Sequence, residues 1–345
     1  MRRSYIAFIG VPISVAAAIA HMPTLSFIAA IVAIVPAAGV IGRATEELAA
    51  HLGPRIGGLV NATLGNVTEF VIAILLIRAG EVEVVKVSLV GSIIGNMLLV
   101  LGAAFLFGGM RHREQAFNAK VAGMHSASLV LAVLGMAMPS VFHSVSGRAP
   151  FLQTETISVG VAGILIVLYV SSLVFSYVTH QDVLGMVHPV DKANWSKRTA
   201  MLVLAGATVL VASESELLVR SLEPATEALG LSKLFVGLML IPLVGNVAEH
   251  WSAVILAMRN KVDTAIEIAV GSSIQIAMLV APLLVFVSLA MGQPMDFFFT
   301  TFEMAALGLA TAVVTVICLD GRSNWLEGAQ LIAAWLIMGL SFYFV

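Results

Sequence analysis

The stretch Leu64–Ile77, with the sequence LGNVTEFVIAILLI, decides the fold because it sets an asparagine and a glutamate in an apolar run. A second stretch, Val244–Ala257 with the sequence VGNVAEHWSAVILA, carries the same Gly-Asn-Val-x-Glu pattern. On insertion scales, a carboxylate at the centre of a membrane helix costs roughly 2.5–3.5 kcal/mol. Two such costs at one register indicate a shared purpose for Glu69 and Glu249.

The whole chain has the composition of a membrane protein. Of its 345 residues, 59% are hydrophobic and 11% are charged, whereas soluble domains carry about 25% charged residues. So few polar groups cannot cover a water-facing surface, and we predict that the lipid bilayer covers most of the chain. The net charge of −2 offers no basic field, so we expect no nucleic-acid partner.

Apolar runs of span length recur along the chain. A helix needs roughly 20 apolar residues to cross the hydrocarbon core, whereas barrel strands are about 10 residues of alternating pattern. The runs therefore predict an all-α membrane protein with eleven transmembrane helices, at about 5–20, 24–42, 57–78, 84–108, 117–139, 156–178, 199–219, 234–258, 264–291, 298–318 and 325–345.

The distribution of Lys and Arg predicts the orientation. With these spans, thirteen of the 18 basic residues fall on the side of the N-terminus and five on the other side. Cytoplasmic loops carry the excess of Lys and Arg. We therefore expect a cytoplasmic N-terminus in a multi-pass protein. The short chain favours a prokaryotic plasma membrane, with a vacuolar membrane as the alternative.

The chain also repeats itself. A shift of 180 positions superimposes the two glutamate motifs and places Gly91-Ser92 on Gly271-Ser272. The motifs lie in the third and eighth predicted spans, so the two copies cross the membrane in opposite directions. We therefore predict an extra N-terminal helix (1–22), two inverted five-helix repeats (23–179 and 199–345) and a cytoplasmic linker (180–198). Inverted repeats with broken helices at the midplane are typical of secondary transporters.

The residues around each glutamate are suited to a hard cation. Asn66 and Asn246 precede the glutamates by three residues, so amide and carboxylate share a helix face. The preceding glycines, Gly65 and Gly245, weaken the helix by about 1 kcal/mol each relative to alanine and could free backbone carbonyls.

The spans that follow each motif add further oxygens. These candidates are Ser92 and Asn96 in the first copy and Ser272, Ser273 and Gln275 in the second. Calcium takes six to eight oxygen ligands, and two glutamates could neutralise its charge. Histidine and sulfur ligands of the kind zinc or copper prefers are not offered.

Some polar residues have a simpler interpretation. A single buried glutamate often only anchors a helix by a hydrogen bond, but two copies at one register argue against that. His250 follows Glu249 directly and points about 100° away on the helix, so we expect packing or gating rather than ligation. For Glu216 and Glu303, nearer the span ends, we expect solvated roles.

The motifs resemble those of the calcium/proton exchangers (CAX) within the cation/calcium exchanger superfamily. The likeness lies in Gly57–Glu69, Phe235–His250, Gly271–Ala277 and Asp320–Gly328, and it extends over nearly the whole chain. The resemblance implies the eleven-span fold and Ca²⁺ and H⁺ as substrates. It implies Glu69 and Glu249 as central ligands that also bind the protons.

By the same resemblance, the supporting oxygens are those of Asn66, Asn246, Ser92, Ser272 and Gln275. Many family members carry an acidic run between the halves, whereas His180–Arg198 contains only Asp182 and Asp191. A regulatory role of that segment is therefore not expected here.

The resulting hypothesis is exchange of Ca²⁺ for H⁺ by alternating access. Two neighbouring carboxylates in a low-dielectric site cannot both stay ionised and empty, so either Ca²⁺ or protons neutralise them. The alternatives are another ion pair, such as Na⁺/Ca²⁺ or Mn²⁺/H⁺, a passive channel, and an intramembrane metalloprotease. The sequence contains no HExxH motif, so we expect no enzyme and no cofactor. The oligomeric state stays open.

Overall fold

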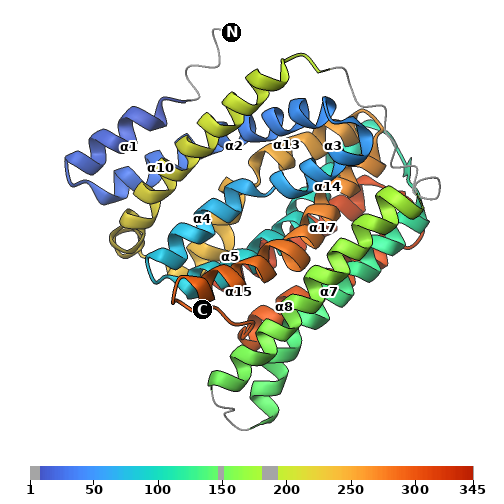
Figure 1. The fold of residues 1–345 in the computed structure, drawn as a ribbon. Helices are drawn as coiled ribbons and strands as arrows, with labels where there is room; N and C mark the ends of the chain where they lie inside the picture. Colours follow the sequence, from blue (N-terminus) through green and yellow to red (C-terminus); the bar gives the residue numbers. More distant parts are fainter. Residues whose placement is uncertain (1–7, 147–150, 181–192, 345) are drawn as a thin grey trace.

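The computed structural model describes residues 8–146, 151–180 and 193–344, which form a bundle of long helices (Figure 1). The first elements are α1 (Gly10–Ile19), α2 (Pro23–Ala50), α3 (Gly53–Leu64), α4 (Val67–Arg78), α5 (Val82–Ile94), η2 (Gly95–Val100), α6 (Leu101–Arg111), β1 (Gln115–Ala116), α7 (Ala119–Val145), α8 (Phe151–Val174) and η3 (Phe175–Thr179). The later elements are α10 (Lys197–Leu229), α11 (Lys233–Phe235), η4 (Val236–Leu240), α12 (Ile241–Gly245), α13 (Val247–Met258), α14 (Val262–Gln275), η5 (Ile276–Val280), α15 (Ala281–Ala290), α16 (Thr301–Ile317), β2 (Arg322–Ser323) and α17 (Trp325–Tyr343). The segments labelled η are π-helical turns.

Several helical segments can cross a membrane. Within the described ranges, seven are long and apolar enough: Pro23–Ala50, Val82–Arg111, Ala119–Val145, Gln153–Thr179, Lys197–Leu229, Val262–Ala290 and Trp325–Tyr343. The pair Lys233–Gly245 and Glu249–Met258 passes the same test together, although it is bent by 61°. Gly10–Ile19 and Thr301–Ile317 are shorter apolar helices. The protein is therefore an integral, multi-pass membrane protein, and the count of eleven spans stays a prediction.

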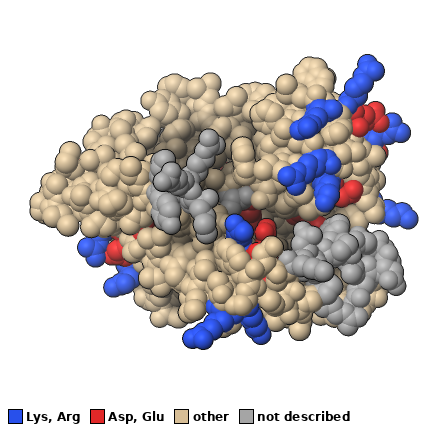
Figure 2. Space-filling view, turned by 90° about the horizontal axis from the view of Figure 1, so that it is seen from above, with Lys and Arg blue, Asp and Glu red and all other residues tan. Residues whose placement is uncertain are grey.

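Parts of the predicted organisation fall outside the described residues. Residues 1–7 of the predicted extra helix and residues 181–192 of the predicted linker are among them. Charge is sparse on the face seen in Figure 2, where several Lys and Arg side chains lie toward one end and others lie at the opposite end and along one edge.

Two spans form the centre of the bundle. The most apolar window of Val82–Arg111 is 83% buried and that of Val262–Ala290 is 61% buried, against 22% for Trp325–Tyr343. The central spans contain α5 and α14, which carry the Gly-Ser pairs noted in the sequence. Tertiary packing thus places these polar residues where lipid cannot reach them.

Small residues allow α1, α2 and α10 to pack closely, and α2 and α10 run side by side (Figure 1). A Cβ atom added at Gly10 would lie 2.7 Å from the carbonyl oxygen of Ala29. Ala33 and Ala37 on the same helix α2 are fully buried. Because lipid gives helices no hydrophobic reason to associate, such close backbone approach is what holds membrane helices together.

Each glutamate motif coincides with a broken helix, and the break lies one residue after the glycine at which we expected it. Asn66 separates α3 from α4, and Asn246 separates α12 from α13. The backbone leaves helical geometry at both asparagines, with ψ of 23° and 7°. A 12-residue half-helix such as α4 is about 18 Å long, too short to cross a bilayer of about 30 Å alone. Both motifs therefore lie at the interior end of a half-helix.

Two loops tie the halves of the chain together. We call residues 115–118 the first strap; its strand β1 pairs antiparallel with β2. The side chain of Gln115 donates to the Ala257 carbonyl oxygen at 2.8 Å, and the backbone N–H of Asn118 donates to Asp263 at 2.7 Å. Asp263 lies in the first turn of α14. The first strap therefore holds the start of a central helix of the second half.

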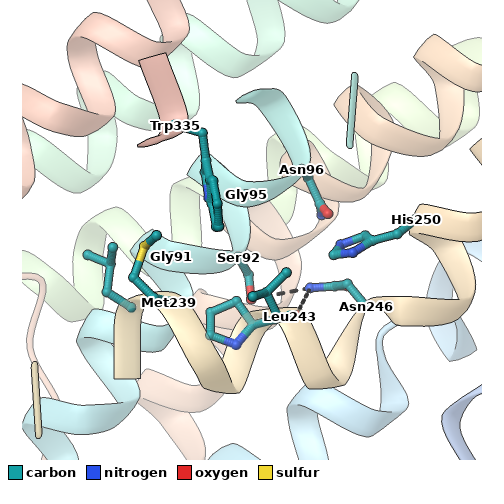
Figure 3. A pocket seen from close by; sticks show the side chains of 11 residues that line it. Gly91, Ser92, Gly95, Asn96, Met239, Leu243, Asn246, His250 and Trp335 are labelled. Atoms are coloured by element: carbon teal, nitrogen blue, oxygen red, sulfur yellow. Dashed lines mark hydrogen bonds between the residues drawn. The ribbon is translucent and has the colours of Figure 1, made fainter. Parts of the chain in front are cut away.

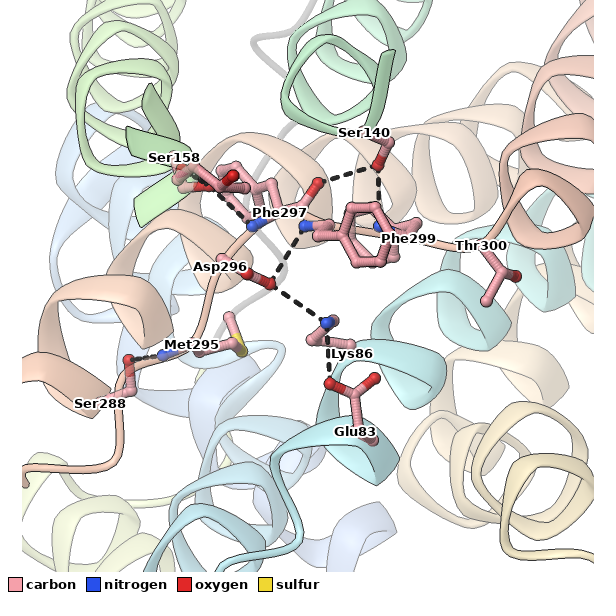
Figure 4. Close-up of polar contacts among 12 residues, drawn as sticks. Glu83, Lys86, Ser140, Ser158, Ser288, Met295, Asp296, Phe297, Phe299 and Thr300 are labelled. Atoms are coloured by element: carbon pink, nitrogen blue, oxygen red, sulfur yellow. Dashed lines mark hydrogen bonds and ion pairs between the residues drawn. The ribbon is translucent and has the colours of Figure 1, made fainter. Parts of the chain in front are cut away.

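The second strap, residues 295–299, lies at the positions related to the first by the 180-residue shift. Its residues alternate, with Met295, Phe297 and Phe299 buried. Their backbone N–H groups donate to serine hydroxyls from three helices, which are Ser288, Ser158 and Ser140 respectively (Figure 4). Buried non-helical backbone in a membrane protein is stable only where its N–H and C=O groups have such hydrogen-bond partners.

The second strap is also held by a buried charge on α5. The ammonium group of Lys86 lies 3.1 Å from Asp296 and 2.9 Å from Glu83 (Figure 4). It lies 5.8 Å from the centre of the Phe298 ring, within range of a cation–π interaction. The Lys86 side chain is 5% exposed, and that of Asp296 is 15% exposed. Each strap thus contacts the start of the central helix in the other half.

Replacing Lys86 by alanine is expected to lower stability strongly, because it leaves Asp296 buried without its cation. Breaking a buried pair costs about 3–5 kcal/mol, whereas an exposed pair is worth about 0–1 kcal/mol. Lys233 is the matched control, since it pairs with Glu81 at 2.8 Å but is 36% exposed. Thermal unfolding in detergent should show a much larger fall for Lys86→Ala than for Lys233→Ala. Equal falls would contradict a structural role for the buried pair.

Candidate cation-binding site

Both glutamates lie in the first turn of the half-helix that follows a break. Glu69 is the third residue of α4, and Glu249 is the third residue of α13. The free backbone N–H groups and the dipole at a helix N-terminus favour negative charge. The two breaks thus place each carboxyl group where the backbone itself offsets part of the cost of burying it.

The two helix breaks lie against each other. A Cβ atom added at Gly245 would lie 2.9 Å from Glu69 Oε1, and one added at Gly65 would lie 3.4 Å from Glu249 Oε1. Each carboxyl group therefore packs against the glycine of the other copy, and the two groups interact electrostatically. Residues 180 positions apart in the sequence meet in one place.

Neighbouring polar residues orient the two motifs. The Asn66 amide donates to Gln275 Oε1 at 2.8 Å, and Ser272 Oγ donates to Glu249 Oε2 at 2.7 Å. The Asn246 amide donates to the Pro242 carbonyl oxygen at 3.2 Å and, at 3.4 Å, to Ser92. These contacts join six residues of the predicted ligand set, which are Asn66, Ser92, Asn246, Glu249, Ser272 and Gln275. The seventh, Glu69, lies beside them through its packing against Gly245.

The other predicted residues are placed differently. Ser273 donates to the carbonyl oxygens of Ala269 and Ile93, so its hydroxyl ties α14 to α5. Asn96 and His250 line a small cavity beside Ser92 and Asn246 (Figure 3).

Four oxygen atoms in the site are buried and have no hydrogen-bond donor among the described residues. They are Asn66 Oδ1, Asn246 Oδ1 and both carboxyl oxygens of Glu69. A buried polar atom left unpaired costs about 1–3 kcal/mol, so several such atoms in one place indicate a site for a partner that donates hydrogen bonds or carries positive charge. Neutral and carboxylate oxygens together form a ligand set for a hard cation, and protons can neutralise the carboxylates in its place.

The arrangement differs from a histidine or cysteine metal centre. Across residues 8–146, 151–180 and 193–344, no group of three or more His, Cys, Asp or Glu side chains is placed to hold a metal ion. The site has two carboxylates, and amide and hydroxyl oxygens surround them. Such a site suits a cation that must leave again.

The two sides of the site are packed unequally. A Cβ atom at Gly91 would overlap the Leu238 carbonyl of η4, whereas one at the related Gly271 would meet nothing described within 4 Å. Ile56 of α3 is 56% exposed, while the related Val236 of η4 is fully buried. The η4 side is therefore packed more tightly than the α3 side.

Sequence reasoning missed two buried charges. Lys86 lies within the predicted span 84–108 and is 4% exposed, and Glu214 lies near the middle of the 33-residue helix α10, where it is 1% exposed. A charge inside a long apolar run was the available signal for both. Glu303, expected in a solvated role, is 4% exposed and forms a capping box with Thr300, whereas Glu216 pairs with Arg220 near the surface.

The fold and site define a class: a helical, multi-pass membrane transporter with buried acidic residues in broken helices. The family model described as sodium/calcium exchanger protein matches residues 22–178 and again 199–344. The chain belongs to this sodium/calcium exchanger protein family.

Individual relatives cover almost the whole chain. The Ca²⁺/H⁺ antiporter of Aphanothece halophytica is 42% identical over 97% of this chain and 94% of its own length. The Ca²⁺/H⁺ antiporter ChaA of Bacillus subtilis is 42% identical over 97% and 96%. Among solved structures, native YfkE matches with a TM-score of 0.87 at 38% identity, covering 99% of this chain and 100% of YfkE. The H⁺/Ca²⁺ exchanger CAX, at 15% identity, shares the fold with a TM-score of 0.75 and coverage of 99% and 91%.

Replacing Gly245 by alanine is expected to weaken cation binding, because the new methyl group would displace the Glu69 carboxyl. Overpacking of this kind costs about 1–3 kcal/mol, which corresponds to a fall in affinity of roughly tenfold or more. The matched control is Gly271→Ala, which has space around it. Calcium titration of the purified protein should separate the two variants. Wild-type affinity in Gly245→Ala would show that the carboxyl of Glu69 does not bind the ion from this position.

Replacing Ser272 by alanine is expected to lower calcium affinity about tenfold, because a hydrogen bond to a charged group is worth about 1.5–3 kcal/mol. The adjacent Ser273→Ala removes a hydroxyl of the same kind that bonds only to backbone among its described contacts. Calcium titration of both variants tests this difference. A larger loss of calcium affinity in Ser273→Ala than in Ser272→Ala would show that Ser273, and not Ser272, orients the site.

Proposed function

We propose that this chain is a secondary active transporter that exchanges Ca²⁺ for H⁺ across a membrane. The observation that carries the proposal is the group of four unpaired, buried oxygens around Glu69 and the two asparagines. The names of the relatives at 42% identity over nearly the full chain support the ion pair. The site contains ligands but no reacting group, so we propose a transporter without enzymatic activity or cofactor.

Exchange follows from the cost of leaving the site empty. When Ca²⁺ binds, its two charges neutralise Glu69 and Glu249. When Ca²⁺ leaves, protons bind to the same two carboxylates and neutralise them instead. The empty and fully ionised site would have to carry two negative charges through a low-dielectric barrier. That barrier suppresses movement of the empty site, and each transport step is therefore coupled to an exchange of ligands.

The proposed architecture is eleven spans, which form two inverted five-helix repeats and an extra N-terminal helix outside them. The bent pair around Asn246 would then be the eighth span, and its counterpart around Asn66 would be the third. Alternating access would reverse the unequal packing on the two sides, opening the η4 side as the α3 side closes. The unequal packing at Gly91 and Gly271 supports this proposal.

The proposed orientation places the N-terminus in the cytoplasm of a prokaryotic cell, in its plasma membrane. Most Lys and Arg residues would then face the cytoplasm, as they do in membrane proteins generally. In this orientation, a proton gradient directed into the cell would drive calcium out. Bacterial relatives support the choice of membrane.

The test is calcium uptake into proteoliposomes loaded at acidic pH. Wild-type protein should accumulate calcium while the pH gradient lasts, whereas Glu69→Gln and Glu249→Gln should lose uptake because each removes a charge that neutralises the ion. Glu216→Gln is the matched control, since its carboxyl pairs with the exposed Arg220 and should transport as wild type does.

Three outcomes would overturn parts of the proposal. Coupled uptake that persists in either glutamine variant would remove that glutamate from the site. Uptake that follows a sodium gradient but not a pH gradient would move the chain to the sodium/calcium branch that the family description includes. Flux without any counter-ion movement would indicate a channel.

A further inference from the structure

A small cavity lies directly beside the cation site. It measures about 10 Å³ and lies between α5, η2, η4, α12, α13 and α17 (Figure 3). Its polar wall is formed by Ser92, Asn96, Asn246 and His250, and its apolar wall includes Met239. A volume of about 10–15 Å³ is what one water molecule needs.

Three unpaired polar atoms belong to residues that line this cavity. They are Asn96 Nδ2, Asn246 Oδ1 and His250 Nε2, and none has a hydrogen-bond partner within the described part of the chain. Asn96 is 1% exposed and Asn246 is 2% exposed, so solvent outside the protein cannot satisfy them. In Figure 3 the side chains of Asn96 and His250 extend toward Asn246.

The related positions of the other copy are apolar. The 180-residue shift places Asn96 on Ile276 and His250 on Phe70. On that side the Asn66 amide bonds directly to a protein group, Gln275 Oε1. The two asparagines of the site are therefore held in different ways, although their own motifs are identical.

We propose that the cavity binds one ordered water molecule, which holds Asn246 on one side of the site only. The water accepts a hydrogen bond from Asn96 Nδ2, donates one to Asn246 Oδ1 and makes a third with His250 Nε2. These three partners fall within the two to four that a buried water makes. Asn96 and His250 are thus positioning residues, which act on the cation through the water and Asn246.

The water and the cation can share the oxygen of Asn246. A carbonyl oxygen has two lone pairs, so Asn246 Oδ1 can face the ion with one and the water with the other. The Asn246 amide nitrogen already donates to the Pro242 carbonyl oxygen and to Ser92 Oγ, which leaves Oδ1 as the unpaired atom of this side chain. The water would fix that orientation before the ion arrives. This inference rests on the proposed function, since it concerns the affinity of the same site.

The test replaces each polar residue by its counterpart in the other copy, giving Asn96→Ile, His250→Phe and the double variant. Calcium titration of the purified, full-length protein should show affinity reduced roughly tenfold in each single variant, because the water loses a partner. The double variant should bind calcium about as weakly as the weaker of the two single variants, because Asn96 and His250 act through the same water molecule. Met239→Leu, a volume-conserving change in the apolar wall, should bind as wild type does.

A density map that resolves ordered water gives the second measurement. A peak about 3 Å from all three atoms supports the proposal, and a map that shows ordered water elsewhere but none here overturns it. Wild-type affinity in the folded variants, or losses that multiply in the double variant, would overturn it as well. If the wild-type protein itself binds no calcium, the proposed function fails, and the density at this cavity still decides the question of the water.

Discussion

Two carboxyl groups buried away from water, one in each half of the chain, are the constraint on which the rest of this structure depends. Glu69 and Glu249 would each be costly in hydrocarbon. The chain reduces this cost by ending a helix just before each glutamate, so that the N-terminus of the next half-helix faces the charge. The break needs a residue that leaves helical geometry, and it needs space for a carboxyl group. Gly245 supplies that space for Glu69.

A site made from two broken helices must be held by parts that do not break. The two central spans, with α5 and α14, provide this support. Ser92 of α5 accepts a hydrogen bond from Asn246 of the other copy, and Ser272 of α14 donates one to Glu249 of its own copy. The straps fix where these spans begin, through Asp263 in one half and Lys86 in the other. Rigid central helices with more loosely packed half-helices around them are compatible with movement on one side of the site at a time. The unequal packing of Gly91 and Gly271 shows that the two sides need not be in the same state.

The two halves share a motif but not its surroundings. Asn66 is bonded to Gln275, whereas Asn246 bonds to Ser92 and to the backbone beside a cavity. Phe70 in one copy stands where His250 stands in the other. The shared motif therefore sets an asparagine and a glutamate in both halves, and different residues at neighbouring positions make the halves unequal. An ion that enters from one side and leaves from the other meets two different environments.

The sequence alone determined the membrane class, the helical spans and the two glutamates, because hydropathy, span length and repeat register are local properties of the chain. The breaks at Asn66 and Asn246 were predictable to within one residue from the preceding glycines. The number of spans and the roles of the site residues remain predictions from that same reasoning. Only the tertiary structure decided that Gln275 bonds to Asn66 and that Asp296 neutralises Lys86, since these partners are 209 and 210 residues apart. No local pattern encodes such pairs, because they depend on which helices the packing of the whole bundle brings together.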